Sequence, residues 1–319
     1  MTSLEKVRGR FAPSPSGELH LGNAWTALLA WLQVRSQRGI MVLRMEDLDP
    51  ERSHTAYATG IMRDLAWLGL DWDEGPDIGG PYSPYVQNER CQLYQEVLDK
   101  LICADLIYPC YCSRAEIQNA ASAPHAGEGE CIYPGTCRSN IGGQKNRFDG
   151  RKPALRLKVP DQTLTFDDGV RGQVVQNLAK TTGDFIVRRS DGVHAYQLAV
   201  VVDDAMMRIS HVLRGDDLLM STPRQLFLYQ TLKFTPPKFM HVPLLYSPDG
   251  RRLSKRQQHL TLAALRQRKV AAEKIVGYLA WKAGLLDSWQ SVRSADLVSC
   301  FSLENISRKA VIVDYNAFL

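Results

Sequence analysis

Two short segments, far apart in the chain, carry residues suited to phosphate chemistry. The first, His20 to Asn23 (HLGN), opens an apolar helical segment, and the second, Arg252 to Arg256 (RLSKR), follows the turn sequence SPDG. Free backbone N–H groups at a helix N-terminus bind phosphate, and His20 could donate a hydrogen bond to an oxygen that gains charge in the transition state. A mobile loop with Lys255 could close on a triphosphate and stabilise departing pyrophosphate. Together the segments predict an ATP site for adenylate formation.

Each segment also has an ordinary structural interpretation. Ser16 and Asn23 could be helix caps with His20 a surface histidine, and a basic loop is usually only solvated. Gly22 would let a nucleotide approach the backbone, which any side chain would obstruct. Because the two segments occur together, we favour the ATP site. Its predicted catalytic residues are His20 and Lys255, and its predicted ATP contacts are His20, Gly22, Asn23, Ser254 and Lys255.

The hydrophobic pattern predicts the elements that position these segments. Strands are expected at 7–11, 40–45, 154–159, 185–189, 197–202 and 242–246. Helices are expected at 24–34, 53–68, 87–106 and 223–232, with a mostly helical tail from residue 260. This alternation predicts an α/β fold, in which a Rossmann-type parallel sheet is split by a β-rich insertion and followed by a C-terminal helical module.

Composition sets broad limits on the kind of protein. The chain has 319 residues, 45% of them apolar, which is enough for two or three domains with a sizeable core. A net charge of +5 allows a polyanionic partner without requiring one. No apolar run approaches the roughly 18 residues of a membrane span, and residues 1–6 carry no apolar secretory stretch. We therefore expect a cytoplasmic protein that does not interact with membranes.

Four of the seven cysteines lie between Cys110 and Cys137, a density that indicates metal ligands in a reducing compartment. Tetrahedral zinc needs four donors, commonly thiolates, and Cys110, Cys112 and Cys137 supply three. On chemical grounds Cys131 is the ordinary choice for the fourth and Tyr133 an unusual one. His125 is expected to be a loop residue.

The motifs together resemble the class I aminoacyl-tRNA synthetases of the glutamyl type. HLGN stands where that family has its HIGH motif and RLSKR where it has KMSKS, with Asn23 and Arg256 departing from the pattern. Further matching segments are RFAPSPSG from Arg10, RMEDLDPER from Arg44, DGVHAYQLAVVVDD from Asp191 and HVLRGDDLL from His211. The resemblance covers roughly residues 7 to 260. It implies a Rossmann-type catalytic domain in two halves (1–102 and 185–246), a zinc-containing, acceptor-binding-like insertion (103–184) and a loop with a helical, stem-contact-like module (247–319).

The same segments fit a small dicarboxylic amino acid as substrate. A buried carboxylate is best held by a guanidinium fork, so Arg10 and Arg214 are candidates for the two substrate carboxylates, although Arg214 could instead bridge to Asp216 or Asp217. Glu46 and Asp47 could be an acidic helix-capping pair, but their place after a strand favours the site. By resemblance, Glu46 takes the substrate ammonium and Tyr196 lines its pocket. The resemblance implies glutamate contacts from Arg10, Phe11, Ala12, Pro13, Ser14, Glu46, Tyr196 and Arg214, and ATP bound with Mg²⁺.

The spacing Cys-x-Cys then Tyr-x3-Cys resembles the zinc site of one glutamyl-type subgroup, in which the tyrosine binds metal. This resemblance implies one structural zinc ion held by Cys110, Cys112, Tyr133 and Cys137, with Cys131 as the alternative to Tyr133. Fewer residues follow Lys255 than the roughly 100 of a typical domain, which predicts that an anticodon-binding domain is missing.

The subgroup with this truncation is monomeric. It activates L-glutamate with ATP without needing tRNA, and transfers the amino acid to the queuosine at the wobble position of the tRNA(Asp) anticodon loop. That function is therefore implied by resemblance. The alternatives are a truncated glutamyl-tRNA synthetase that charges the usual acceptor end, a nucleotidyltransferase, and a non-catalytic tRNA-binding paralogue.

Overall fold

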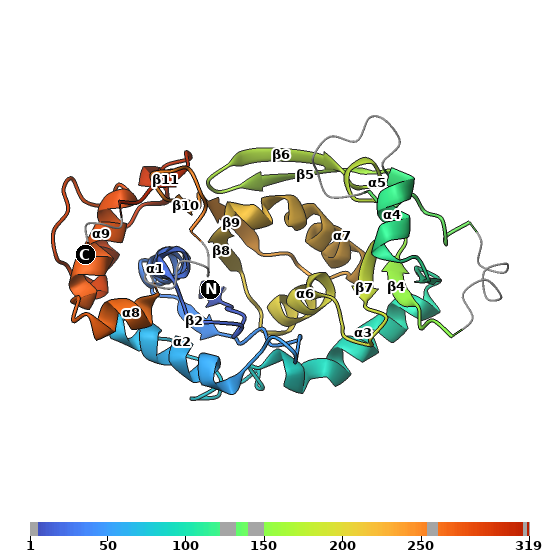
Figure 1. The fold of residues 1–319 in the computed structure, drawn as a ribbon, viewed down its shortest axis with the longest axis horizontal. Coiled ribbons are helices and arrows are strands. Elements are labelled where there is room, and N and C mark those ends of the chain that lie inside the picture. Colours follow the sequence, from blue (N-terminus) through green and yellow to red (C-terminus); the bar gives the residue numbers. More distant parts are fainter. Residues whose placement is uncertain (1–5, 122–131, 140–149, 254–260, 315–317, 319) are drawn as a thin grey trace, which may run out of the picture.

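The computed structural model describes residues 6–121, 132–139, 150–253, 261–314 and 318, with a parallel sheet near the middle of the molecule (Figure 1). In spatial order its strands are β2 (Ile40–Leu43), β1 (Arg8–Phe11), β8 (His211–Gly215) and β9 (Lys238–Val242). Every neighbouring pair is parallel. Because β1 and β8 are adjacent yet far apart in sequence, the sheet is built from two separate segments, which confirms the predicted split α/β fold.

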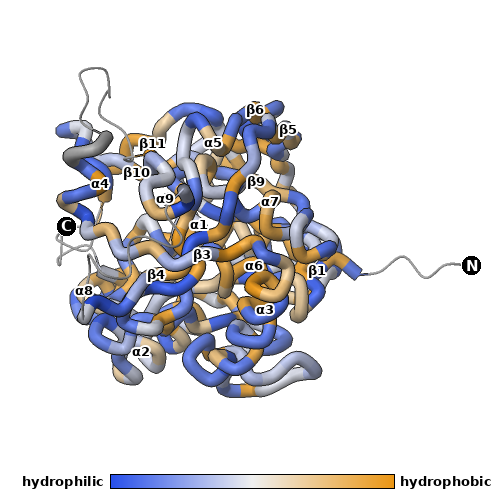
Figure 2. The backbone as a smooth tube through the Cα atoms, turned by 90° about the vertical axis from the view of Figure 1, so that its right-hand side faces the viewer, coloured by the Kyte–Doolittle hydropathy of each residue, from blue (hydrophilic) through white to orange (hydrophobic). Residues whose placement is uncertain are grey.

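The two faces of this sheet pack against different helices. One core combines helix α1 (Leu21–Arg35) with the strand residues Met41, Leu43, Leu213, Met240 and Val242. The other combines α6 (Tyr196–Met206) and α7 (Thr222–Leu232) with Val42, Val212 and Phe239. Successive strand residues thus point to opposite cores, and both faces are buried, as expected of a parallel sheet. Hydrophobic stretches at α1 and α6 lie in the interior in Figure 2.

Helix α6 corrects a prediction, because residues 197–202 were expected to form a strand. Every residue from Leu198 to Asp204 is buried. A helix enclosed on all sides shows no amphipathic period, and the run Val200–Val202 is β-branched, so the segment resembles a buried strand. The wrong prediction therefore comes from tertiary burial.

Between the two sheet segments the chain forms a smaller antiparallel sheet and a hairpin. The sheet order is β3 (Ile107–Cys110), β4 (Ala154–Leu157) and β7 (Phe185–Arg188), flanked by α4 (Arg114–Ala121) and α5 (Leu178–Thr181). The hairpin consists of β5 (Thr163–Asp168) and β6 (Gly172–Asn177). It returns to the main sheet, because the Gly169 amide donates to the Phe239 carbonyl over 2.9 Å. Strands β3, β5, β6 and β8 were not predicted, and of β9 only Val242 was.

The remaining elements cover the edges of the molecule. Helix α2 (Thr55–Trp67), the 3-10 helix η1 (Gln87–Arg90) and α3 (Cys91–Cys103) follow β2. The expected strand at 242–246 is not formed as such: β9 already ends at Val242, and the two-residue strand β10 spans Leu245–Tyr246. The tail contains α8 (Leu262–Gln267), α9 (Ala272–Lys282), η4 (Ser294–Cys300), η5 (Leu303–Asn305) and β11 (Val311–Ile312), which pairs with β10. None of the helices in the described residues is long and apolar enough to cross a bilayer.

Candidate active site

A cavity of about 440 Å³ opens where β1 and β8 end, the edge at which parallel sheets bind ligands. Its lining brings together nearly every residue predicted from the sequence: Arg10, Phe11, Ala12, Pro13, Ser14, His20, Gly22, Asn23, Glu46, Tyr196 and Arg214. Arg252 and Leu253 also line it. Ser254 and Lys255, which follow Leu253 in the sequence, lie outside the described residues.

His20 both lines the cavity and caps helix α1. Its Nδ1 accepts the Gly22 amide hydrogen bond at 3.0 Å, and the Asn23 side chain accepts the His20 amide at 3.1 Å. A Cβ on Gly22 would lie 2.8 Å from His20 Cε1, so the missing side chain leaves room for this ring. Because Nδ1 is an acceptor, the proton of the neutral ring lies on Nε2. His20 therefore caps helix α1 and lines the cavity at the same time, so the structural and the functional interpretation of this residue are compatible.

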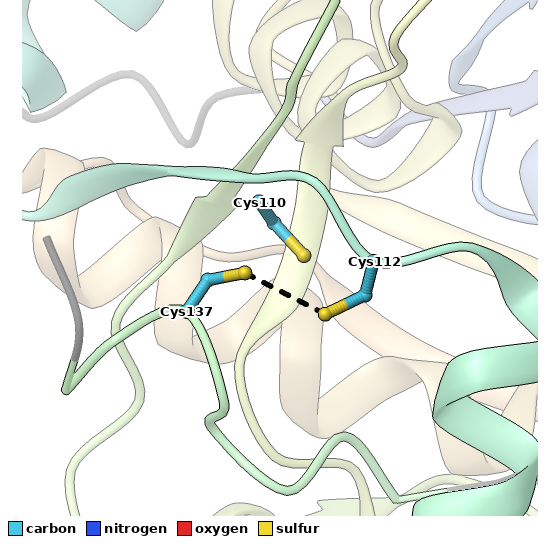
Figure 3. Close-up of side chains that lie close together, drawn as sticks. All are labelled: Cys110, Cys112 and Cys137. Atoms are coloured by element: carbon cyan, nitrogen blue, oxygen red, sulfur yellow. Dashed lines mark hydrogen bonds between the residues drawn. The ribbon is translucent and has the colours of Figure 1, made fainter. Parts of the chain in front are cut away.

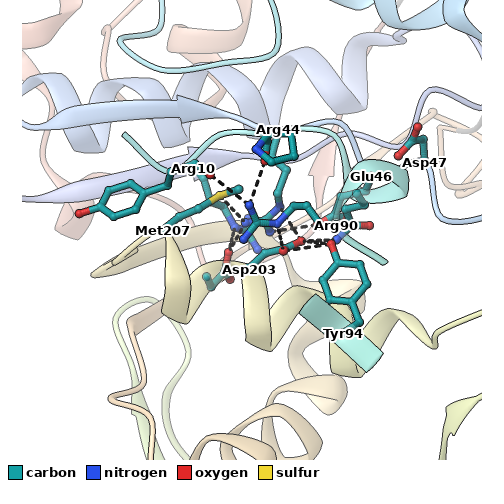
Figure 4. A network of polar contacts seen from close by, with 12 residues as sticks. Arg10, Arg44, Glu46, Asp47, Arg90, Tyr94, Asp203 and Met207 are labelled. Atoms are coloured by element: carbon teal, nitrogen blue, oxygen red, sulfur yellow. Dashed lines mark hydrogen bonds and ion pairs between the residues drawn. The ribbon is translucent and has the colours of Figure 1, made fainter. Parts of the chain in front are cut away.

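Glu46 is held on one side by a buried charge network (Figure 4). Arg44, which is fully buried, donates to Glu46 at 3.1 Å and to Asp204 at 2.7 Å. Arg10 forms an ion pair of 3.5 Å with the same Asp204 carboxylate. Burial raises the pKa of Glu46 and outweighs the two arginines, whereas for Asp204 Arg44 and Arg10 outweigh burial and lower the pKa. Arg44 and Asp204 thus fix Arg10 and Glu46 at the cavity.

The neighbouring Asp203 also lies near Arg44, whose Nε is 3.6 Å from its carboxylate, and it has further partners of its own. Its carboxylate accepts hydrogen bonds from Arg90 at 2.6 Å, Gln87 at 2.8 Å and the Tyr94 hydroxyl at 2.9 Å (Figure 4). These contacts tie α6 to η1 and α3. Both aspartates therefore belong to the Arg44 network, and Asp203 in addition joins the three helical segments.

Arg214 is buried and bonded along two edges of its guanidinium. Nε donates to His241 Nε2 at 2.9 Å, while Nη2 donates to Thr222 at 2.9 Å and to Gln225 at 2.8 Å. Among the described residues, Nη1 has no hydrogen-bond partner. Burial lowers the pKa of Arg214, and nearby Arg10 adds to this effect. A buried, unpartnered NH₂ group at a cavity wall suits an anionic ligand.

Three acidic residues near the cavity, Asp47, Asp216 and Asp217, have partners other than Arg214. Asp217 pairs with Arg252 at 2.7 Å and Asp216 pairs with Arg171, so the predicted alternative of a bridge from Arg214 to either residue is wrong. Asp47 accepts the Asn88 amide at 2.8 Å in the first turn of η1. The capping interpretation therefore holds for Asp47, while Glu46 belongs to the cavity.

A second polar cluster lies at the end of β3 (Figure 3). The sulfur atoms of Cys110, Cys112 and Cys137 all lie within 4.8 Å of one another. The Tyr133 hydroxyl is 3.5 Å from the Cys110 sulfur and 3.9 Å from that of Cys112, and it accepts the Cys137 amide at 2.8 Å. Three sulfurs and one oxygen around a common centre fit a tetrahedral metal ion. Cys131 and His125 lie outside the described residues.

The electrostatics of this cluster distinguish its thiols. Burial raises the pKa of Cys110, but its hydrogen bonding with Tyr133 and Arg156 and the positive charge of Arg156 outweigh burial and hold the pKa below its ordinary value. Burial and the Cys137 thiol raise the pKa of Cys112 to about 12. The Arg156 guanidinium also lies over the Tyr133 ring, 3.7 Å from its centroid. The pKa is thus lowered at Cys110 and raised at Cys112, and a bound cation would favour the deprotonated form of both thiols.

Residues 6–312 match the family described as tRNA synthetases class I (E and Q), catalytic domain. The chain belongs to this family. It is therefore a ligase of the aminoacyl-tRNA synthetase type. Two relatives, each called glutamyl-Q tRNA(Asp) synthetase, are 51% identical over 308 residues: one from Nitratidesulfovibrio vulgaris (96% of this chain, 95% of the relative) and one from Symbiobacterium thermophilum (95% and 94%).

A solved structure shares the same fold over nearly the whole chain. The glutamate tRNA ligase from Elizabethkingia meningosepticum, determined in complex with its amino acid, superposes with a TM-score of 0.84 at 27% identity. The match covers 98% of this chain and 68% of the ligase. The similarity agrees with the family assignment.

Sequence reasoning missed the residues behind the cavity wall. Asp203 and Asp204 were noted only as part of a motif, although two carboxylates after a buried apolar run signal a paired arginine. His241 and Asp168 were not singled out, because nothing local connects a histidine in an apolar strand with an aspartate 73 residues away. Only the tertiary fold reveals this pair.

Proposed function

We propose that this enzyme activates L-glutamate with ATP and transfers it to the queuosine of tRNA(Asp). Two similarities support the choice within the family: relatives of that name are 51% identical over nearly the full length of both chains, and the Cys-x-Cys, Tyr-x3-Cys cluster is assembled in the structure. The acceptor is a cis-diol on the queuosine ring, chemically akin to the ribose diol of an ordinary acceptor end.

The observation that carries the glutamate assignment is the unpartnered Nη1 of buried Arg214, which lines the same cavity as Arg10 and Glu46. We assign the two arginines to the substrate carboxylates and Glu46 to the ammonium group. Tyr196 and the segment from Phe11 to Ser14 complete the lining. The arrangement offers both signs of charge that zwitterionic glutamate requires.

ATP binds, in this proposal, at the N-terminus of α1, where Gly22 and Asn23 border the cavity. A glutamate carboxylate oxygen attacks the α-phosphorus in line, the bond to the bridging oxygen breaks and pyrophosphate leaves as its magnesium complex. His20, through Nε2–H, and Lys255 stabilise the developing charge, and Ser254 contacts the nucleotide. A queuosine hydroxyl then attacks the mixed anhydride, losing its proton as AMP departs.

The cysteine cluster fits zinc by its donor set. We propose that Cys110, Cys112, Tyr133 and Cys137 hold one zinc ion, which would join the end of β3 to the segment at 132–139. With all four positions filled by protein atoms, the role is structural. It would stabilise the insertion that receives the RNA, in a monomeric enzyme of a reducing compartment such as the cytoplasm.

The direct test is charging of tRNA(Asp), prepared with and without queuosine, with labelled glutamate, ATP and Mg²⁺. We expect label only on the queuosine-containing RNA. Label on both RNAs would indicate acceptor-end aminoacylation instead. If neither RNA is labelled but glutamate-dependent pyrophosphate exchange is intact, the proposed activation step is supported and the proposed RNA acceptor is wrong. Exchange that does not depend on an amino acid would favour a nucleotidyltransferase, and no exchange at all a non-catalytic paralogue.

A further inference from the structure

A buried aspartate–histidine pair lies directly behind Arg214. His241 occupies the position beside Arg214 in the register of β9 and β8, and it is fully buried. Its Nδ1 lies 2.6 Å from Asp168 Oδ2, and its Nε2 accepts the Arg214 Nε–H at 2.9 Å. An uninterrupted chain of hydrogen bonds therefore runs from Asp168 through His241 to the guanidinium.

These contacts define which nitrogen of His241 carries the proton. A guanidinium has only donors, so His241 Nε2 must be an acceptor. The ring proton then lies on Nδ1, where it is donated to Asp168. With the proton on Nε2, two N–H groups would face each other across the 2.9 Å contact and the hydrogen bond to Arg214 would be lost.

The position of Asp168 is itself strongly determined. Its Oδ1 accepts backbone hydrogen bonds from Arg171 at 2.8 Å, Val170 at 3.0 Å and His241 at 3.1 Å. The residue ends β5, in the hairpin that packs onto β9. Such a carboxylate cannot turn away from the imidazole without giving up these bonds, so the hairpin fixes the orientation of the ring.

We propose that Asp168 and His241 are positioning residues for the glutamate site: they hold Arg214 so that its free Nη1 faces the substrate carboxylate. The inference rests on the proposed role of Arg214 in binding glutamate. With Nε held by His241 and Nη2 held by Thr222 and Gln225, the plane of the guanidinium is fixed, and among its contacts within the described part of the chain only Nη1 remains for a ligand. Neither Asp168 nor His241 lines the cavity.

The substitution Asp168→Asn tests this role at nearly constant volume. The asparagine amide can donate to Nδ1, which moves the imidazole proton to Nε2 and opposes Arg214. Loss of one buried hydrogen bond at a charged group should raise the KM for glutamate in pyrophosphate exchange about ten- to hundredfold, with the KM for ATP within about twofold. The matched control is Asp167→Asn, the exposed neighbour on β5, which should leave both constants unchanged.

Two readouts separate positioning from a merely structural link. In protein labelled with ¹⁵N-histidine, the His241 imidazole should carry its proton on Nδ1 in the wild type and on Nε2 in Asp168→Asn. Glutamine at position 241 offers an oxygen to Arg214 that needs no help from Asp168. His241→Gln should therefore keep much of the glutamate affinity, and Asp168→Asn should have little further effect in that background.

The outcomes are distinguishable. Folded Asp168→Asn with a normal KM for glutamate, or a wild-type His241 protonated on Nε2, would overturn the positioning role. Equal rises in the KM for glutamate and for ATP, with a lower melting temperature, would reduce the pair to a structural link. If Asp168→Asn does not fold, the positioning role is tested by the protonated nitrogen of His241 in the wild type and by the KM for glutamate of His241→Gln. A normal KM for glutamate in Arg214→Gln would overturn the underlying assignment of Arg214 itself.

Discussion

The cavity and the cysteine cluster each hold chemically similar groups close together, carboxylates in the first and thiols in the second. They differ in how these groups are stabilised. At the cavity Arg44 neutralises Asp204 and Glu46 with protein charges alone, and Arg214 is bonded on two edges. At the cluster three sulfurs lie within 4.8 Å, and burial with neighbouring groups raises the pKa of Cys112 to about 12. The first site is preorganised by the fold, whereas the donor set of the second would be completed by a bound cation.

The strongest way to break this comparison is to remove Arg44. Arg44→Met should lower the free energy of unfolding by about 3–5 kcal/mol, because it removes the buried cation that Glu46, Asp203 and Asp204 share. Urea denaturation measures the loss. The exposed Arg52→Met is the control and should change stability by less than about 0.5 kcal/mol. If Arg44→Met costs no more than the control, the cavity floor does not depend on this charge.

The next largest effect is expected at the loop that completes the ATP site. Lys255→Ala should depress the rate of pyrophosphate exchange about 10²–10³-fold, because it removes a stabilising charge from the transition state. The KM for glutamate should stay within about threefold, since the preorganised pocket does not need the loop. Arg251→Ala serves as control. Near-normal exchange in Lys255→Ala would refute its catalytic role.

A smaller effect is expected for a substitution in the cysteine cluster, which should change zinc affinity without changing the KM for glutamate at the cavity. Tyr133→Phe should weaken zinc binding at least about tenfold, measured by competition with a chromophoric chelator, while the KM for glutamate is unchanged. Tyr111→Phe, between the two cysteines of the Cys-x-Cys motif, is the matched control. One zinc per chain with unaltered affinity in Tyr133→Phe, together with zinc loss in Cys131→Ser, would assign the fourth ligand to Cys131.

The mildest test uses pH. Glu46 faces Arg44, Arg10 and Asp204, and its pKa is raised by burial, so acidification protonates it before an ordinary glutamate. The KM for glutamate should rise by up to about tenfold per pH unit below this pKa, as attraction for the substrate ammonium is lost. In Glu46→Gln the rise should begin only where the substrate carboxylates protonate. Identical pH profiles for the two proteins would remove Glu46 from ammonium binding.

The sequence predicted those parts of the fold whose pattern is local. Helix α1 and strands β1 and β2 follow from turn residues and apolar runs, and they were predicted to within a few residues. Helix α6 was missed because burial on every side removes its period. The hairpin of β5 and β6 was missed because its strands are half exposed and its packing partner, β9, lies far along the chain.

The same distinction applies to the site. Only part of the cavity lining was predicted, including His20, Glu46 and Arg214, because these residues lie in local motifs at a helix start or after a strand. Residues that orient them were not, because Arg44, Asp204 and His241 gain their meaning from partners brought together only by folding. Charge pairing between distant elements leaves little trace in a single sequence.

The return of the β5–β6 hairpin to β9 has a consequence for protein engineering. The region between the two sheet segments is not an interchangeable cassette, because Asp168, which belongs to it, is bonded to His241 of the main sheet. A chimera that exchanged this region for that of a distant synthetase would need a matching aspartate, or the histidine behind Arg214 would lose its partner. The insertion and the strand that carries His241 are thus joined by a buried contact that any such chimera would have to preserve.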